Sequence, residues 1–400
     1  MKDVLFLCQF FYPEYVSSAT LPFDTATALV EAGFSVDVIT GYPHEYTLVN
    51  SVVKNEIING IGINRLKYLQ LSRRNFLGRL LNYFSFTLSV LTRIPRVRNY
   101  KIIVIYSNPP ILPLVAILAN YLYNIKIIFI CYDVYPEIAK VTNSISANGI
   151  IDRTMQKINA LLFPRLHAVI SLSSEMKEFL LANRVGIETE KIIVIPNWYE
   201  DLYLKSQIEQ IDKAMFTVSY FGNMGVCQDI DTIIEAIKLL KNNHSIKFKF
   251  AGHGSKLDSL KTIVKENNLD NVVVYDFLHG EAYLKALSLS DVFLVSLERG
   301  VSGLAVPSKT YSYMMSGKPI IAIIDENTDI ARDLSDNNAG YVINSGDAES
   351  LVDALHLLQR DTSIRSEQGK NSRKIYLDKY SKDICLKKYI SLIKNTIGIA

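Results

Sequence analysis

The stretch "FTVSYFGNMGVCQDIDTIIEAIKLLKNNHSIKFKFAG", residues 216–252, contains one complete unit of the fold that the sequence predicts. Residues 216–222 and 245–252 are short runs, rich in β-branched and aromatic side chains, that end at glycine, as buried strands do. Between them, residues 230–243 carry apolar side chains at helical spacing. A strand, a helix and a second strand in this order indicate a βαβ unit with parallel strands.

The same alternation continues in both directions along the 400 residues. Further strands are predicted at 3–10, 34–40, 101–107, 125–133, 167–173, 271–277, 291–297 and 318–324. Helical spacing appears between them, for example over residues 19–33, and the pattern pauses over residues 195–215. We therefore predict an α/β protein built from two doubly wound, Rossmann-like domains.

The predicted domains are residues 1–198 and residues 199–381, followed by a helical, lysine-rich segment, residues 382–400. That last segment either returns to the N-terminal domain or stands apart from it. Doubly wound sheets bind ligands at the carboxyl ends of their strands, so two such domains are expected to place a ligand site in the cleft between them.

The composition favours a cytosolic protein without a membrane span. The four cysteines are widely scattered, which predicts neither a disulfide framework nor a metal site. The apolar N-terminal run follows Asp3 and leads to no small-residue cleavage site, so it reads as a first strand. No apolar run reaches the ~20 residues that a transmembrane helix needs.

The net charge of +3 is unevenly distributed, because no acidic residue lies between Glu56 and Asp133. Within that interval, residues 72–101 combine seven basic side chains with aromatic and aliphatic ones. This pattern predicts contact with an anionic membrane surface, although a solvated basic face on a core-packed helix would look the same. No nucleic-acid recognition motif accompanies it, so no nucleic-acid partner is predicted.

The turn within residues 220–231 is the first candidate binding motif. Gly222 and Gly225 lie between a strand and a helix that starts near Asp229 or Asp231, which exposes backbone N–H groups where a diphosphate would sit. A plain strand-to-helix turn with an aspartate cap is the alternative. "AGHG", residues 251–254, is a second glycine turn at a strand end.

The second motif is "VPSKTYSYMMSGKP", residues 306–319. Pro307 suits the first turn of a helix, Ser308 suits its cap, and Gly317 suits its end. Lys309 adds a positive charge near the start, where a phosphate would be attracted. A surface helix with one lysine is the simpler alternative.

These motifs, together with "YDVYPE" at 132–137 and "IPNW" at 195–198, resemble the GT-B nucleotide-sugar glycosyltransferases of family 4. Within that family, the chain is most similar to the bacterial surface-polysaccharide branch that carries a Pro-Ser-Lys signature. The resemblance implies a retaining transfer of a sugar from a nucleoside-diphosphate donor to an acceptor hydroxyl, with no bound metal and no cofactor. It also implies that the C-terminal domain binds the donor.

The resemblance implies the donor-binding residues Gly222, Asn223, Gly225, Gln228, Gly252, Leu304, Ala305, Val306, Ser308, Lys309 and Ser312. Two groups of these residues differ from those usual in the family. Leu304 and Ser312 occupy the places of a glutamate pair, of which the second commonly contacts the donor ribose. Asn223 and Gln228 stand where many members have Arg and Lys, so more of the diphosphate charge is expected to fall to Lys309.

In the N-terminal domain, Glu14 and Asp133 follow predicted strands. With Lys309 they are the candidate catalytic residues. Glu14 and Asp133 would position the acceptor hydroxyl or stabilise positive charge on the sugar ring, and Lys309 would offset the charge of the leaving diphosphate. Asp133 would alternatively cap the turn before Pro136. The residues expected on the acceptor side are Ser17, Ser18, His44 and Glu137, the last of which rivals Asp133.

The function that the resemblance implies is transfer of an N-acetylated hexosamine or 6-deoxyhexosamine from a UDP-sugar to a polyprenyl-diphosphate-linked saccharide. Such an enzyme would work at the inner face of the cell membrane in O-antigen, capsule or exopolysaccharide assembly. Two alternatives remain, namely a nucleotide-sugar 2-epimerase and a non-catalytic module that binds sugar nucleotides.

Overall fold

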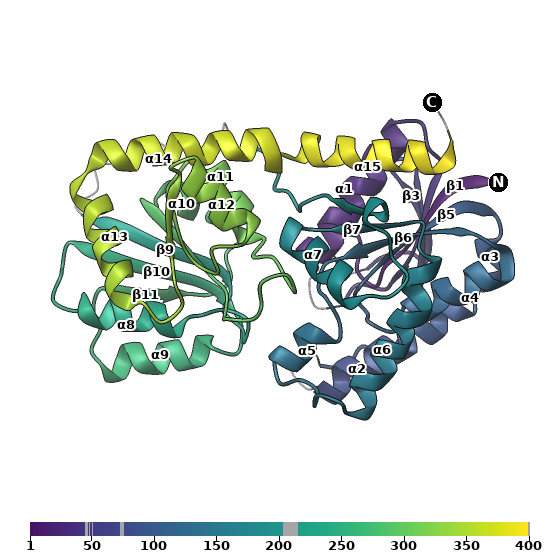
Figure 1. The fold of residues 1–400 in the computed structure, drawn as a ribbon, viewed down its shortest axis with the longest axis horizontal. Coiled ribbons are helices and arrows are strands. Elements are labelled where there is room, and N and C mark those ends of the chain that lie inside the picture. The colour runs from purple at the N-terminus through teal and green to yellow at the C-terminus, as the bar shows by residue number, and fades with distance from the viewer. Residues whose placement is uncertain (45–46, 48, 50, 73–75, 203–214, 399–400) are drawn as a thin grey trace. The chain divides into compact units, whose positions relative to one another are not determined.

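A computed structural model describes residues 1–44, 47, 49, 51–72, 76–202 and 215–398 (Figure 1). The chain divides into two compact units. Unit 1 comprises Met1–Pro196, Gly303–Ala305 and Cys385–Ala400, and unit 2 comprises Asn197–Ser302 and Val306–Ile384. Each unit is built on one largely parallel sheet, which confirms the predicted α/β class.

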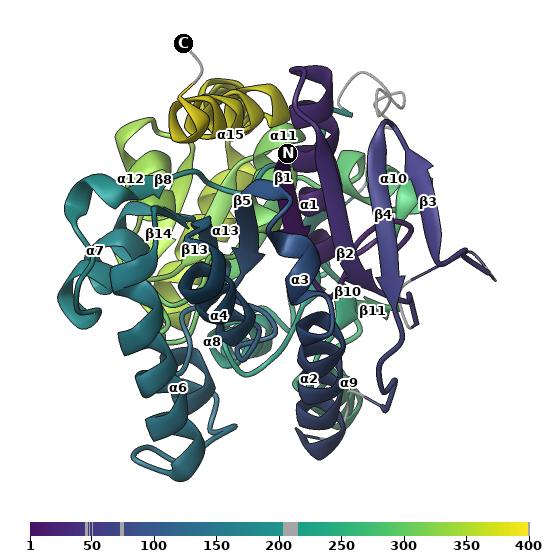
Figure 2. The same cartoon turned by 90° about the vertical axis from the view of Figure 1, so that its right-hand side faces the viewer.

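Unit 1 contains an eight-stranded sheet in the order β3-β4-β2-β1-β5-β6-β7-β8 (Figure 2). Its strands are β1 Lys2–Leu7, β2 Val36–Gly41, β3 Asn55–Ile58, β4 Ile61–Leu66, β5 Tyr100–Tyr106, β6 Lys126–Cys131, β7 Ala168–Ser171 and β8 Ile192–Val194. The five strands predicted for this half are present. The prediction missed β3, β4 and β8; β3 pairs antiparallel with β4, and its alternating exposed and half-buried residues lack the apolar run of a central strand.

Helices complete unit 1. They are α1 Ser17–Glu31, α2 Phe76–Leu91, α3 Ile94–Val97, α4 Pro113–Tyr123, α5 Glu137–Val141, α6 Ile150–Leu162, α7 Ser174–Asn183 and, from Cys385 onward, α15 Lys382–Ile397. Lys126 Nζ donates a hydrogen bond of 2.5 Å to the carbonyl of Thr396 and so ties β6 to α15. Among the described residues, no helix combines the length and the apolar character needed to cross a membrane.

Unit 2 contains a parallel sheet of six strands in the order β11-β10-β9-β12-β13-β14. The strands are β9 Phe216–Asn223, β10 Ile246–His253, β11 Val272–Tyr275, β12 Val292–Ser296, β13 Ile320–Ile323 and β14 Gly340–Ile343. The helices are α8 Asp231–Leu239, α9 Leu257–Glu266, α10 Gly280–Ser288, α11 Lys309–Met315, α12 Asp329–Asp336, α13 Ala348–Arg360 and α14 Thr362–Ile375. The βαβ unit of the opening stretch is therefore β9-α8-β10, with the parallel pairing predicted for it.

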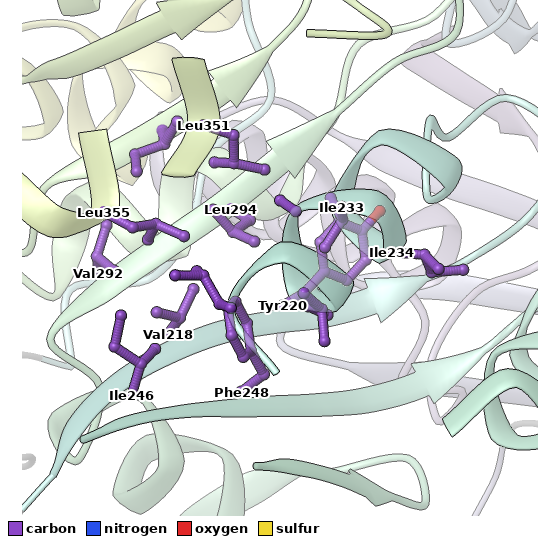
Figure 3. Packing of buried hydrophobic residues seen from close by; sticks show 14 of the residues in the cluster. Val218, Tyr220, Ile233, Ile234, Ile246, Phe248, Val292, Leu294, Leu351 and Leu355 are labelled. Atoms are coloured by element: carbon purple, nitrogen blue, oxygen red, sulfur yellow. The ribbon is translucent and has the colours of Figure 1, made fainter. Parts of the chain in front are cut away.

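The core of unit 2 fills the space between one face of this sheet and helices α8 and α13 (Figure 3). Val218 and Phe248 come from the strands, whereas Ile233 and Leu351 come from the helices. Removing such side chains from water stabilises the unit by roughly 1.5–3 kcal/mol for each large one. Because side chains alternate along a strand, this packing fixes which side chains near the end of β9 face the core.

Helix α11 is attached to β9 through Tyr313. The Tyr313 hydroxyl accepts a 2.7 Å hydrogen bond from the Phe221 N–H and donates one of 2.7 Å to the Phe221 carbonyl. Its ring stacks on Phe293 of β12, with 4.1 Å between ring centroids. These contacts fix the helix that begins at Lys309 beside the carboxyl end of β9.

Candidate active site

Three glycines allow the carboxyl ends of β9 and β10 to approach each other. Gly222, Gly252 and Gly254 have φ angles of +131°, +145° and +133°, which L side chains rarely adopt. A Cβ atom at Gly252 would lie 1.9 Å from the Gly222 carbonyl oxygen, and one at Gly254 would lie 2.3 Å from the Met224 carbonyl oxygen. Only glycine fits this edge of the sheet, where parallel α/β sheets bind their ligands.

Residues 222–230, part of which the sequence predicts to bind the donor and which we call the donor loop, close on themselves before α8. The Gly225 N–H donates a 2.9 Å hydrogen bond to Oε1 of Gln228, and Gln228 is buried. Asp229 Oδ1 accepts a 2.9 Å hydrogen bond from the Thr232 N–H, which satisfies one donor in the first turn of α8. Asn223 is exposed. Asn223 and Gln228 thus shape the loop and add no charge to it.

Lys309 provides a positive charge at this edge. Its Nζ donates hydrogen bonds of 2.9 Å to the Asn223 carbonyl and 2.5 Å to the Tyr220 hydroxyl, and it lies 3.8 Å from the centroid of the Tyr220 ring. None of the ion pairs found among the described residues includes Lys309. Lys309 is half-buried, and loss of water around its ammonium group lowers its pKa well below the ordinary value. An anion bound here would supply the missing counter-charge.

The two serines of the second motif differ in their surroundings. Ser308 is half-buried at the N-cap position of α11, where its hydroxyl makes no capping hydrogen bond. Ser312 is only 1% exposed; its Oγ donates a 2.8 Å hydrogen bond to the Lys309 carbonyl and shares one of 2.7 Å with the Tyr283 hydroxyl. In this structure Ser312 joins α11 to α10 and does not face solvent. Of the loop residues before α11, Leu304 is buried, while Ala305 and Val306 are half-buried.

In unit 1, Asp133 follows β6 in a turn organised by Ser107. The Ser107 Oγ accepts hydrogen bonds of 3.0 Å and 3.1 Å from the N–H groups of Tyr132 and Asp133. Burial raises the pKa of Asp133 to about 6. A carboxyl with this pKa changes charge close to neutrality, as residues at functional sites often do.

A small cavity of about 20 Å³ adjoins Asp133, with Ser107, Asn159 and Arg184 among its polar lining residues. Such a volume has room for about one water molecule and is too small for a sugar.

Glu137, the rival of Asp133, forms an ion pair. Both of its carboxylate oxygens accept hydrogen bonds from Arg184, at 2.5 Å and 3.0 Å. Arg184 also donates a 3.0 Å hydrogen bond to the Tyr135 carbonyl. This paired arrangement gives Glu137 a structural role in the turn and leaves Asp133 as the stronger candidate for chemistry.

The remaining predicted residues lie near other strand ends of unit 1. Glu14 is buried after β1, and its N–H donates a 3.1 Å hydrogen bond to the Phe11 carbonyl. Ser17 is exposed and Ser18 half-buried in the first turn of α1, which contains no acidic residue. His44 is exposed after β2.

Sequence reasoning missed Tyr220 and Lys256. Tyr220 accepts a hydrogen bond from the Lys309 ammonium group, and the signal for it was a polar-tipped aromatic residue within β9, two residues before Gly222. Lys256 lies two residues after Gly254 in the second glycine turn, and Nζ of this lysine donates a 2.9 Å hydrogen bond to the Gln228 carbonyl. No local sequence pattern predicts the hydrogen bond between Lys256 and Gln228, because 28 residues separate them.

Two family models match the chain, and their descriptions agree with this geometry. The model described as Glycosyltransferase Family 4 matches residues 19–201, and the model described as Glycosyl transferases group 1 matches residues 204–375. Together with the two-sheet fold and the glycine-lined strand ends, these matches define the chain as a glycosyltransferase of the GT-B type.

Individual relatives agree with this class. The chain is 26% identical over 329 residues to a probable glycosyltransferase, WbjE, from Pseudomonas aeruginosa, a match that covers 80% of each chain. It is also 26% identical over 232 residues to a poly(ribitol-phosphate) alpha-N-acetylglucosaminyltransferase of Staphylococcus aureus, covering 58% of this chain and 44% of the relative. Among solved structures, sucrose-phosphate synthase from Thermosynechococcus elongatus has a TM-score of 0.75 at 14% identity, with full coverage of both chains. HepE from Anabaena, solved with UDP and glucose, has a TM-score of 0.72 at 14% identity, covering 99% of this chain and 100% of HepE.

Proposed function

We propose that this glycosyltransferase is a retaining, metal-independent enzyme that uses a UDP-sugar, and that Lys309 and the donor loop bind the donor diphosphate. The observation that carries the proposal is the Lys309 ammonium group, which lies beside Gly222 at the carboxyl end of β9 and forms no ion pair among the described residues. Structural neighbours solved with UDP or UDP-glucose support the choice of nucleotide.

The chemistry follows from where charge develops during transfer. As the bond between the sugar and the diphosphate breaks, negative charge grows on the leaving phosphate oxygens. Donors that are already in place stabilise this charge more than water does, because they need no reorganisation. Lys309 would supply the cation, and backbone N–H groups of the donor loop would supply neutral donors. Asp133, when ionised, would stabilise the positive charge that grows on the sugar ring.

We further propose that the sugar is an N-acetylated hexosamine or a 6-deoxyhexosamine, and that the acceptor is a saccharide linked to a polyprenyl diphosphate. The name of the Staphylococcus relative, an N-acetylglucosaminyltransferase, supports the first choice. Assembly of O-antigen, capsule or exopolysaccharide at the inner face of the cell membrane is the role that fits such a substrate.

An apolar face on α2 supports the membrane location. Leu77, Leu81, Phe84 and Leu88 recur at helical spacing, and Leu77 and Leu88 are 64% and 66% exposed. Residues 57–132 contain no acid, so α2 and its neighbours in the sequence would not repel anionic lipid. We propose that α2 rests in the interface of the membrane and does not cross it. Arg73 and Arg74, which belong to the predicted basic segment, lie outside the described residues.

The proposal is tested with the purified chain and a panel of nucleotide sugars. A true donor should raise the melting temperature, because a ligand that binds only the folded state stabilises it by mass action. Release of UDP in the presence of a polyprenyl-diphosphate saccharide should then follow. Lys309→Ala should lose donor binding, whereas Lys238→Ala, which removes an exposed lysine of α8, should not.

The two alternatives predict different results. A 2-epimerase would convert UDP-N-acetylglucosamine to its epimer without any acceptor. A binding module would be stabilised by the nucleotide sugar but would release no UDP. Unchanged donor binding and transfer in Lys309→Ala would refute the site itself.

A further inference from the structure

Three acidic side chains lie together beside the donor loop. The carboxylate oxygens of Asp229, Asp231 and Glu298 lie within 4.8 Å of one another. Such a group resembles the oxygen ligands of a divalent cation. However, Asp229 already accepts hydrogen bonds from the Thr232 hydroxyl at 2.6 Å and from the Ser345 hydroxyl at 2.5 Å.

The ammonium group of Lys256 takes the place of the cation. Its Nζ donates hydrogen bonds to Glu298 Oε1 at 2.6 Å, to the Gln228 carbonyl at 2.9 Å and to Asp231 Oδ2 at 3.0 Å. These three acceptors match the three protons of an ammonium group; two come from residues 228–231 and the third from the segment after β12. Burial lowers the pKa of Lys256, but the hydrogen bonds to Glu298 and Asp231 more than offset that effect and raise it. Lys256 is therefore charged.

The backbone around Lys256 holds the same loop. The Lys256 N–H donates a 2.9 Å hydrogen bond to the Met224 carbonyl, and the Glu298 N–H donates one of 2.8 Å to the Cys227 carbonyl. With the bond from Nζ to the Gln228 carbonyl, the segment 224–228 is held at its first residue and at its last two. A loop held in this way keeps its N–H groups in one arrangement before any ligand arrives.

We propose that Lys256 is a positioning residue that holds residues 224–228 in the donor-binding conformation, with its ammonium group performing the task of a structural cation. This inference rests on the proposed function, because it assigns the loop to donor binding. Lys256 itself forms no contact with the donor in this proposal. It acts through Gln228, Asp231 and Glu298.

The first test measures loop order without any ligand. Hydrogen exchange of the 224–228 amides should be faster in Lys256→Ala than in the wild type, whereas Lys238→Ala should leave it unchanged. UDP affinity, measured by calorimetry, should fall roughly 10- to 100-fold in Lys256→Ala, since charge-assisted hydrogen bonds of this kind are lost. If alanine prevents folding, Lys256→Met keeps the apolar stem and provides the same comparison.

The second test replaces the missing ammonium group. In Lys256→Ala, the vacated acidic group should bind Ca²⁺, and this ion should slow exchange of the 224–228 amides back toward the wild-type rate. The double variant Lys256→Ala/Glu298→Gln should not respond to Ca²⁺. A structural role for Lys256 in general packing alone would produce no such rescue, because packing depends on the side-chain stem and not on a cation.

Clear results would overturn the inference. Unchanged loop exchange and unchanged UDP affinity in Lys256→Ala would show that Lys256 does not position the loop. Ca²⁺ binding at these acids in the wild type would show that the ammonium group does not occupy the cation position. If the wild type fails to bind UDP while loop exchange still depends on Lys256, the proposed function fails and the positioning of the loop stands.

Discussion

At the scale of single residues, two of the proposed site residues have pKa values displaced from the ordinary ones. Lys309 and Asp133 both lose water, and burial disfavours the charged form of each. An unbound site of this kind stores an unfavourable interaction that a ligand of opposite charge relieves. Because protonation changes the charge of both groups, ligand binding and the stability of the folded protein should depend on pH.

We expect UDP affinity to fall as pH rises from 7 to 10. The pKa of Lys309 is lowered in the free protein, and a bound diphosphate would raise it, so binding above the free-protein pKa requires proton uptake. Affinity should be constant below that pKa and fall by up to about tenfold per pH unit above it. Calorimetry in buffers of different ionisation enthalpy would measure the uptake. Lys309→Arg, which stays charged, is the control, and an equally steep fall in that variant would contradict the assignment.

Asp133→Asn should be more stable than the wild type at pH 7.5 and equally stable near pH 3.5. Its folded pKa of about 6 exceeds the ordinary value of 3.8, so the folded state loses stability as pH rises through this interval. The gain for the variant should be on the order of 1–2 kcal/mol, allowing for partial exposure. Chemical denaturation at both pH values measures it, with the exposed Asp270→Asn as control. Transfer activity should fall in the same variant; a gain in stability without that loss would remove Asp133 from the proposed chemistry.

At the scale of elements, the candidate site is made where strand ends and helix starts meet. The β9-α8-β10 unit brings Gly222 and Gly252 into register across two parallel strands. Helix α11 reaches the same edge because Tyr313 attaches it to β9 and Phe293 stacks on it. Each element is held by its own apolar face, which leaves the loops between them free to carry polar groups.

Gly252→Ala tests this close approach. The added Cβ would overlap the Gly222 carbonyl oxygen, and φ is unfavourable, so we expect a loss of roughly 2–4 kcal/mol of unfolding free energy. Gly346→Ala is the matched control, because its φ is +89° but no atom lies within 4 Å of the new Cβ. That variant should lose only about 1 kcal/mol. Thermal and urea unfolding would compare the two, and equal losses would show that the strand ends can separate.

At the scale of the whole molecule, the proposed membrane location rests on the distribution of charge and apolar surface. Unit 1 carries the acid-free interval and the exposed apolar face of α2. Helix α4 adds exposed Leu118 and Tyr121 without any charged residue. A surface of this kind is costly in water unless a partner or membrane covers it.

The variant Leu81→Ser/Phe84→Ser/Leu88→Ser should lose binding to vesicles that contain anionic lipid. Each substitution removes apolar area that would be buried in the interface. Co-sedimentation with phosphatidylglycerol vesicles at two salt concentrations measures the effect, and wild-type binding should weaken in high salt. Leu239→Ser, an exposed leucine on α8 in unit 2, is the control. If the wild type stays in the supernatant at low salt, α2 does not bind membranes.

The sequence by itself determined the class of fold and the position of the main motifs. Alternating apolar runs and helical spacing predicted ten strands that are present, because burial on both faces imposes a local pattern on a parallel strand. The glycines at 222, 252 and 254 likewise located the ends of β9 and β10, since positive φ angles favour glycine. The edge strands β3, β8 and β14, together with β4 beside β3, were missed; an edge strand is short and buried on fewer sides, so it lacks that pattern.

Only the tertiary structure decided what each polar side chain does. Ser312 was predicted to replace a donor-binding glutamate, yet its hydroxyl is buried against Tyr283; Glu137 forms an ion pair with Arg184. Lys256 reaches Gln228 and Glu298 across 28 and 42 residues. Local sequence cannot encode such contacts, because they arise only when separate elements pack and place distant side chains within hydrogen-bonding distance.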